Sequence, residues 1–140
     1  MYELFRTWTP GDTVTLNLPM TWRLVKGHQL QEGKVALLRG PVVYCLGTDQ
    51  NAELLQKYPN FHSVVVDPNS LGEPEADTSI RPDGRKVTAS ARVEAKGEWS
   101  KGAPHETLIF TEFTDPTGIM TYFRVLDLGC AEDDELVSDE

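Results

Sequence analysis

The sequence lacks a long apolar run, a cluster of basic residues and the start of a secretory signal, and each absence excludes a class of protein. No apolar stretch reaches the roughly 18 residues that a membrane-spanning helix needs, so we expect no membrane partner. The longest basic group is Arg85-Lys86. Phosphate backbones are bound by larger groups of Lys and Arg, so we expect no nucleic-acid partner. Residues 1–6 have neither the charged start nor the apolar core of a signal peptide, and they read like the middle of a strand. This start predicts an excised or truncated piece and leaves the compartment open.

Cysteine is scarce. The two cysteines, Cys45 and Cys130, are too far apart for a Cys-x-x-Cys redox pair or a zinc ribbon. We predict that both are small core residues, and a disulfide between them stays open as an alternative.

Metal and cofactor motifs are absent as well. Each of the three histidines stands alone, without the short spacing that presents two ligands to zinc: His28, His62 and His105. The segment from Asp67 begins like a calcium loop, but Leu71 occupies its fifth position and Thr78 replaces the bidentate glutamate of the twelfth. The sequence therefore predicts no metal and no cofactor.

Acidic residues are concentrated at the C-terminus. The chain carries 13 basic and 22 acidic residues and a net charge of −9, of which six acids lie between Glu132 and Glu140. We therefore predict one β-domain over residues 1–130 and a disordered acidic tail over residues 131–140.

The N-terminal third carries strong turn and strand signals. Thr9-Pro10-Gly11-Asp12 places Pro and Gly as a type II turn requires. Alternating apolar residues follow it at Val14, Leu16 and Leu18. We predict strands over residues 2–7 and 13–24, the second bent at Pro19 or lying at a sheet edge.

Further strands are expected along the rest of the chain. Residues 34–46 predict a buried strand with a bulge or kink at Gly40-Pro41, and residues 86–96 alternate strictly between small apolar and polar side chains. Other predicted elements are a helix over 51–58, a strand over 63–67, a mobile loop over 68–84, and strands over 106–113 and 119–127. The last two strands are predicted to pair as an antiparallel hairpin through a turn at Asp115-Pro116-Thr117-Gly118.

These elements predict an all-β fold, an antiparallel β-sandwich or jelly roll with one short helix. A closed barrel stays open, because the number and spacing of strands do not distinguish it from a sandwich.

Two strings in the first third of the chain resemble a known family. They are Trp8-x-x-Gly11-Asp12-Thr13-Val14-x-Leu16-x-Leu18-Pro19-Met20 and Val35-Ala36-Leu37-x-Arg39-Gly40-Pro41-Val42-Val43-Tyr44-Cys45. They resemble the C-terminal region of bacterial β-L-arabinofuranosidase-like glycoside hydrolases (family 127), once catalogued as a domain of unknown function. The resemblance implies that a separate helical (α/α)-barrel holds the catalytic cysteine and the zinc ligands. This chain would then be a β-sandwich region without catalytic residues, and Cys45 would not be the nucleophile.

An ordinary glycosidase site needs two facing carboxylates. The candidates outside the tail and the long loop are Glu94, Glu98, Glu106, Glu112 and Asp115. Glu112 is the hardest to dismiss because it lies in an apolar strand, and we expect it to pair with a basic residue such as Arg39 or Arg124. The sequence therefore gives almost no support to an enzyme in its own right.

Sugar-binding modules stack sugar rings on exposed aromatic side chains. We predict that Trp8 packs under its turn and that Trp22 is a core residue. Trp99 lies in a polar, glycine-flanked loop and is the one predicted carbohydrate-binding residue, with simple loop packing as the alternative. The leading hypothesis is a non-catalytic accessory module that packs against the catalytic helical-barrel domain of a glycoside hydrolase, with residues 68–84 closing one side of its cleft. The alternative is an independent carbohydrate-binding module that uses Trp99.

Overall fold

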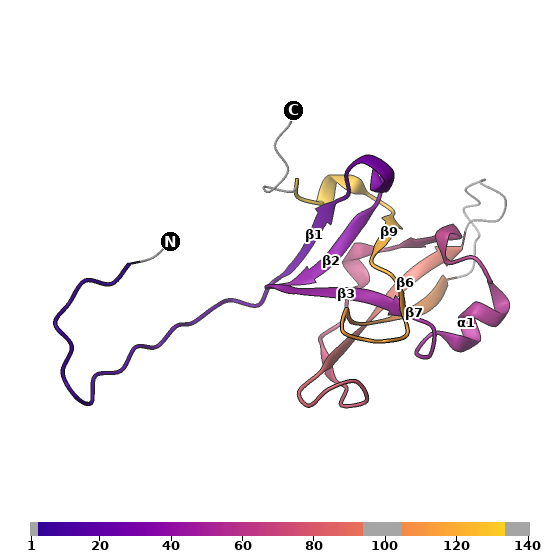
Figure 1. The fold of residues 1–140 in the computed structure, drawn as a ribbon. Coiled ribbons are helices and arrows are strands. Elements are labelled where there is room, and N and C mark those ends of the chain that lie inside the picture. The colour runs from indigo at the N-terminus through magenta and orange to yellow at the C-terminus, as the bar shows by residue number, and fades with distance from the viewer. Residues whose placement is uncertain (1–2, 94–104, 134–140) are drawn as a thin grey trace.

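The computed structural model describes residues 3–93 and 105–133, and this part of the chain is mostly β-structure (Figure 1). The strands are β1 Trp22–Lys26, β2 Val35–Arg39, β3 Val42–Gly47, β4 Val64–Val66, β5 Glu75–Ala76, β6 Arg85–Val93, β7 His105–Glu112, β8 Gly118–Met120 and β9 Tyr122–Val125. The helices are α1 Ala52–Lys57 and the short 3-10 helices η1 Gln29–Gln31, η2 Phe61–Ser63, η3 Pro68–Ser70 and η4 Leu128–Cys130. The all-β class with one short α-helix is confirmed for the described residues. None of the helices in this part of the chain is long and apolar enough to cross a membrane.

The sheet closes on itself. Six strands form a ring in the order β2-β9-β4-β6-β7-β3, and β3 returns to β2. Outside the ring, β1 pairs with β2, β8 with β3 and β5 with β6. The β4–β9 pair is parallel, whereas the other pairs of described strands are antiparallel. The observed arrangement is thus a six-stranded β-barrel.

The predicted sandwich or jelly roll is corrected to this barrel. The reason lies in β2, β3 and β9, which bridge what would otherwise be two sheets. Gly40 has a positive φ of +55°, so Gly40-Pro41 forms a tight turn where the sequence predicted a bulge or kink. After this turn β3 first pairs with β2 and then crosses to β7, while β9 joins β2 to β4.

The barrel interior is filled by alternating apolar side chains. The prediction for β6 is confirmed within the described residues, since its buried positions are Val87, Ala89, Ala91 and Val93. Phe110 and Phe123 meet inside the barrel with ring centroids 4.9 Å apart. The predicted helix is also confirmed as α1, which buries Leu54.

The predicted hairpin of the last two strands is wrong. β7 and β8 do not pair with each other, because β3 lies between them: Leu46 of β3 faces Phe110 of β7 on one side and Met120 of β8 on the other. The turn that connects them is nevertheless confirmed, with the Gly118 amide donating to the Asp115 carbonyl at 3.0 Å.

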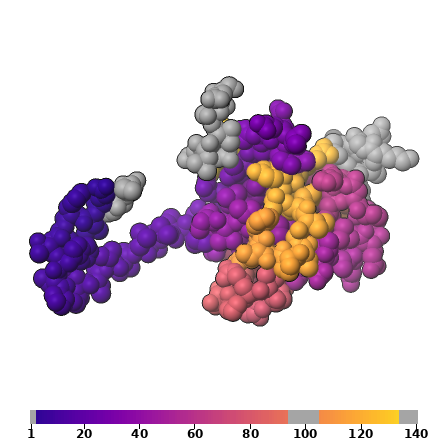
Figure 2. All heavy atoms as spheres, viewed as in Figure 1, coloured from indigo at the N-terminus to yellow at the C-terminus, as the bar shows by residue number. Residues whose placement is uncertain are grey.

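The first 19 described residues form an extended N-terminal arm, defined here as residues 3–21, and not the predicted strands (Figures 1 and 2). β1 begins only at Trp22, because no other strand of the described chain lies beside the arm. The turn at Thr9–Asp12 is confirmed by a 3.0 Å hydrogen bond from the Asp12 amide to the Thr9 carbonyl and by the φ of +97° at Gly11. Trp8 is half-exposed under the Arg6 guanidinium and is not packed beneath the turn.

The C-terminal end of the predicted domain and the predicted mobile loop are both bonded to the barrel strands. Ala131 is buried, and Glu132 exchanges backbone hydrogen bonds with Leu24 and Lys26 of β1. Residues 134–140, the rest of the predicted acidic tail, lie outside the described residues. The loop over 68–84 contains η3 and β5 and is joined to β6 by a 3.0 Å hydrogen bond from the Gly72 amide to the Thr88 carbonyl.

Candidate functional site

Among the residues that the structure describes, Glu112 at the end of β7 is the most deeply buried carboxylate, with 5% of its surface exposed. Arg81 from the 68–84 loop donates to both of its oxygens, Nε to Oε2 at 2.5 Å and Nη2 to Oε1 at 2.8 Å. The backbone amide of Arg85 adds a third hydrogen bond at 3.2 Å. The expected partner was Arg39 or Arg124, so this expectation is wrong in identity but right in kind. A carboxylate held by three donors anchors the loop and has little capacity left for proton transfer.

Tyr44 lies beside this ion pair in the barrel wall, opposite Glu112 in the β3–β7 register. Burial raises the pKa of its phenol, and the negative charge of Glu112 raises it further. Trp22 packs edge-on against the Tyr44 ring, with ring centroids 5.1 Å apart. Tyr44 is therefore a neutral packing residue, and Trp22 lies against the core as predicted.

Asp115 is a second buried carboxylate. It accepts hydrogen bonds from the Thr111 hydroxyl at 2.7 Å and from the amide and hydroxyl of Thr117, both at 2.8 Å. Burial raises the pKa of Asp115, but these donors outweigh burial and the pKa lies below its ordinary value. The carboxylate thus stays ionised and fixes the turn that leads into β8.

Cys45 is buried next to this turn, where its thiol approaches Thr111 Oγ1 at 3.8 Å and the Glu112 carbonyl at 3.6 Å. Burial raises the pKa of the thiol, so it is a poor nucleophile. The core prediction is confirmed for Cys45. It is wrong for Cys130, which lies exposed in η4, and both cysteines are free thiols, so the disulfide alternative is not formed.

Of the remaining candidate acids, one lies in the described part of the chain and two lie outside it. Glu106 pairs with Lys57 of α1 and accepts from the Tyr58 hydroxyl at 3.1 Å. The Lys57 ammonium lowers the pKa of Glu106. Glu94 and Glu98 lie outside the described residues. Within residues 3–93 and 105–133, no three His, Cys, Asp or Glu side chains are grouped so that they could hold a metal ion.

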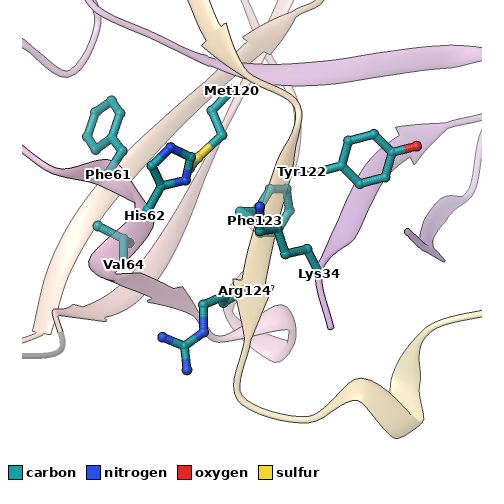
Figure 3. A pocket seen from close by; sticks show the side chains of 8 residues that line it. All are labelled: Lys34, Phe61, His62, Val64, Met120, Tyr122, Phe123 and Arg124. Atoms are coloured by element: carbon teal, nitrogen blue, oxygen red, sulfur yellow. The ribbon is translucent and has the colours of Figure 1, made fainter. Parts of the chain in front are cut away.

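The described surface has hollows of very different size. One lies between β9 and η2 (Figure 3), with Phe61, Met120 and Phe123 as apolar lining and three basic side chains around them. These basic residues are Lys34, His62 and Arg124. A second hollow runs between α1 and the start of β7 and is lined mainly by polar side chains, among them Lys57, His105 and Glu106. Asp49 and Glu53 also line the second hollow, beside Glu106, which is paired with Lys57.

The aromatic candidates do not form a flat sugar platform in the described part of the chain. Trp8 is on the arm, and Trp22 packs against Tyr44. Trp99, the predicted carbohydrate-binding residue, lies outside the described residues.

Sequence reasoning missed two residues that organise this side of the barrel. Arg81 gives no signal beyond its place in an Arg-Pro-Asp-Gly turn. Asn51 is buried before α1, where its side-chain amide donates to the carbonyls of Gly47 and Ile109 and accepts from the Ile109 amide. A polar residue at a helix start is an ordinary capping signal, so its role across β7 was not visible in the sequence.

Comparison with solved structures identifies a similar fold. A GH127 β-L-arabinofuranosidase from Geobacillus stearothermophilus T6 aligns with 76% of this chain and 18% of its own, at 20% sequence identity and a TM-score of 0.54. The fold is similar to that of one region of this GH127 enzyme. The predicted resemblance to this glycoside hydrolase family is thereby confirmed at the level of the fold. A second GH127 β-arabinofuranosidase aligns with 72% of this chain and 16% of its own, at 17% identity and a TM-score of 0.40.

Comparisons of sequence add no match. No protein-family model matches the chain, and no curated protein matches it. The chain spans less than a fifth of the length of the two GH127 enzymes that it resembles.

Proposed function

We propose that this chain is a non-catalytic accessory β-module of a GH127-like glycoside hydrolase and packs against the helical-barrel domain that carries catalysis. The observation that carries the proposal is the fold similarity, which extends over 76% of this chain but over only 18% of the G. stearothermophilus enzyme. A piece of that size corresponds to one region of the enzyme, and most of the enzyme lies outside it.

The engaged carboxylates support the non-catalytic part of the proposal. Glu112, Asp115 and Glu106 are each held by donors from the same chain. A glycosidase needs one carboxyl group as acid and a second as base or nucleophile, both open to substrate. These three side chains are used for internal structure instead.

The surface beside Glu112 supports the packing part. Phe113 directly follows β7 and is 65% exposed, and Ile119 lies in β8 and is 55% exposed. The loop over 68–84 reaches the same end of β7, because Arg81 binds Glu112, the residue before Phe113. We propose that this end of the module, with its apolar side chains and its anchored loop, faces the catalytic domain.

A grafting experiment tests the packing. This chain replaces the aligned segment of the G. stearothermophilus enzyme, and the double substitution Phe113→Ser and Ile119→Ser is introduced into both the graft and the isolated chain. We expect the substitutions to lower the melting temperature of the graft by several degrees more than that of the isolated chain. Equal shifts in the two proteins would contradict packing through this surface.

Two assays on the isolated chain test the rest. We expect no hydrolysis of an aryl β-L-arabinofuranoside, and turnover that survives purification of the chain would overturn the non-catalytic assignment. Titration with arabinan and xylan fragments, followed by tryptophan fluorescence, tests the alternative of an independent carbohydrate-binding module. A saturable change that Trp99→Ala abolishes would favour that alternative over the accessory role.

A further inference from the structure

Residues 13–21 of the N-terminal arm form an exposed, extended segment without charged side chains, and no other strand of the described chain lies beside it. Residues 13–21 contain no charged side chain, and their apolar side chains alternate with polar ones. Leu16 is 78% exposed, and Val14, Leu18 and Met20 are exposed as well. In the described chain, the backbone groups of residues 13–20 make no hydrogen bond to other backbone groups. An uncharged strand with open N–H and C=O groups is a template for pairing with another strand.

The two edges of this strand differ. In β1, which continues the arm, the backbone N–H and C=O groups of the odd-numbered residues point toward β2. The 3.1 Å hydrogen bond from the Gly40 amide to the Thr21 carbonyl shows this direction. The backbone groups of the even-numbered residues point to the opposite edge, where those of Leu24 and Lys26 bond to Glu132. Pro19 has no N–H and belongs to the odd edge. The even edge of the arm, from Val14 to Met20, therefore keeps all its donors and acceptors.

We propose that the arms of two copies of this chain pair antiparallel through their even edges, about a two-fold axis at Asn17. This register places Leu16 opposite Leu18 and Val14 opposite Met20 of the other copy, all as hydrogen-bonded pairs. The apolar side chains of both arms then lie on one face of the ribbon. Pro19 stands in a pair whose amides point away from the other arm, so its missing donor removes no hydrogen bond.

The ends of the ribbon are also complementary. In the same register, Asp12 lies opposite Trp22 of the other copy. The next hydrogen-bonded pair would be Pro10 and Leu24. Pro10 has no amide donor, and the Leu24 carbonyl already accepts from the Glu132 amide at 2.8 Å. The turn at Thr9–Asp12 bends the chain away at this point. Both strands thus run out of free backbone groups together.

A second copy also satisfies the side chains. The apolar face of the arm has the same parity as Trp22 and Leu24 of β1, which face the core. Because the arm carries no net charge between Thr13 and Thr21, the overall charge of −9 does not oppose the contact locally. A closed, isologous pair follows from the two-fold axis.

Sedimentation velocity of the full chain over a range of concentrations tests the proposal, with two variants of equal charge. Leu16→Asp places a carboxylate on the apolar face, whereas Thr15→Asp places it on the opposite, polar face. We expect the unaltered chain and Thr15→Asp to dimerise, and Leu16→Asp to dimerise at least about 100-fold more weakly, because each dimer would bury two charges. In the dimer, the amides of Leu16 and Leu18 should exchange with solvent more slowly than those of Thr15 and Asn17.

Three outcomes would overturn the proposal. A chain that stays monomeric up to millimolar concentration means that the arm binds another protein surface or none. A dimer that survives Leu16→Asp uses another surface, and protection of the odd-numbered amides would place the pairing on the wrong edge. The inference does not depend on the proposed function, since hydrolysis, sugar binding and the behaviour of the graft are measured separately.

Discussion

The guanidinium group of Arg81 donates hydrogen bonds to both carboxylate oxygens of Glu112. These bonds hold the loop over 68–84, which connects β4 to β6, at the end of β7. Glu112 is almost fully buried, whereas the Arg81 side chain is partly exposed. Removing Arg81 would leave a buried carboxylate with only the Arg85 amide as donor.

Arg81→Ala should therefore destabilise the protein by about 1–3 kcal/mol, the usual cost of an unsatisfied buried acceptor. Urea unfolding at neutral pH measures this change. Hydrogen exchange should increase at Asp77 and Gly84, whose amides are hydrogen-bonded within the loop. Arg6→Ala is the matched control, because Arg6 also pairs with an aspartate but on the exposed arm. An equal loss of stability in the two variants would contradict the anchoring role.

Asn51 connects α1 to the barrel, because its side-chain amide makes the two hydrogen bonds to β7 that a neighbouring strand would make. Asn51 is only 4% exposed, and its side chain bonds both the carbonyl and the amide of Ile109. We expect Asn51→Ala to cost about 2 kcal/mol in unfolding free energy, because it leaves the Ile109 groups unpaired. Asn51→Asp should cost more, because it turns a carboxylate oxygen toward the carbonyls of Gly47 and Ile109. Gln50→Ala, which removes a single weak bond, is the control. The order would be contradicted by an aspartate variant as stable as the unaltered protein.

The low pKa of Asp115 makes part of the stability dependent on pH. Because its folded pKa lies below the unfolded value of about 3.9, ionised Asp115 stabilises the fold at neutral pH. This contribution is present above the unfolded pKa and is lost as the pH falls through the folded pKa. The difference in stability between the unaltered protein and Asp115→Asn should therefore shrink between pH 5 and pH 2. Unfolding free energies measured at several pH values check this, and a difference that stays constant would show that the charge of Asp115 has no part in it.

The sequence predicted strands correctly where the alternation of side chains was enough to define them. It failed where the outcome depends on which other strand lies beside the segment. β6 was predictable because its alternation of small apolar and polar residues needs only one wet face and one buried face. The same period-two pattern in residues 13–20 gave a false strand, because alternation reports a strand's faces and says nothing about its edges. The pairing of β7 was mispredicted for a similar reason: a short turn brings β7 and β8 close in sequence, but β3 separates them in the barrel.

The candidate site shows the same division. That Glu112 needed a basic partner followed from its place in an apolar strand. The sequence, however, has six arginines besides Arg81, and only the barrel topology selects Arg81 among them. Closure itself depended on β9 pairing in parallel with β4, a long-range contact that leaves no local mark.

The two thiols should report their different environments directly. Cys130 is exposed in η4, with its thiol 2.8 Å from the Asp127 carbonyl, whereas Cys45 is enclosed by β3 and β7. A disulfide-exchange reagent should label one thiol in the native protein and the second only on unfolding. Burial and the Asp127 charge raise the pKa of Cys130, so native labelling should accelerate toward alkaline pH as the thiolate forms. Cys130→Ser should abolish the fast phase, while Cys45→Ser should keep it. Because Cys45 reacts only from an opened barrel, its labelling rate should fall in step with added stability, and rapid labelling of Cys45 in the native protein would contradict its burial in the barrel wall.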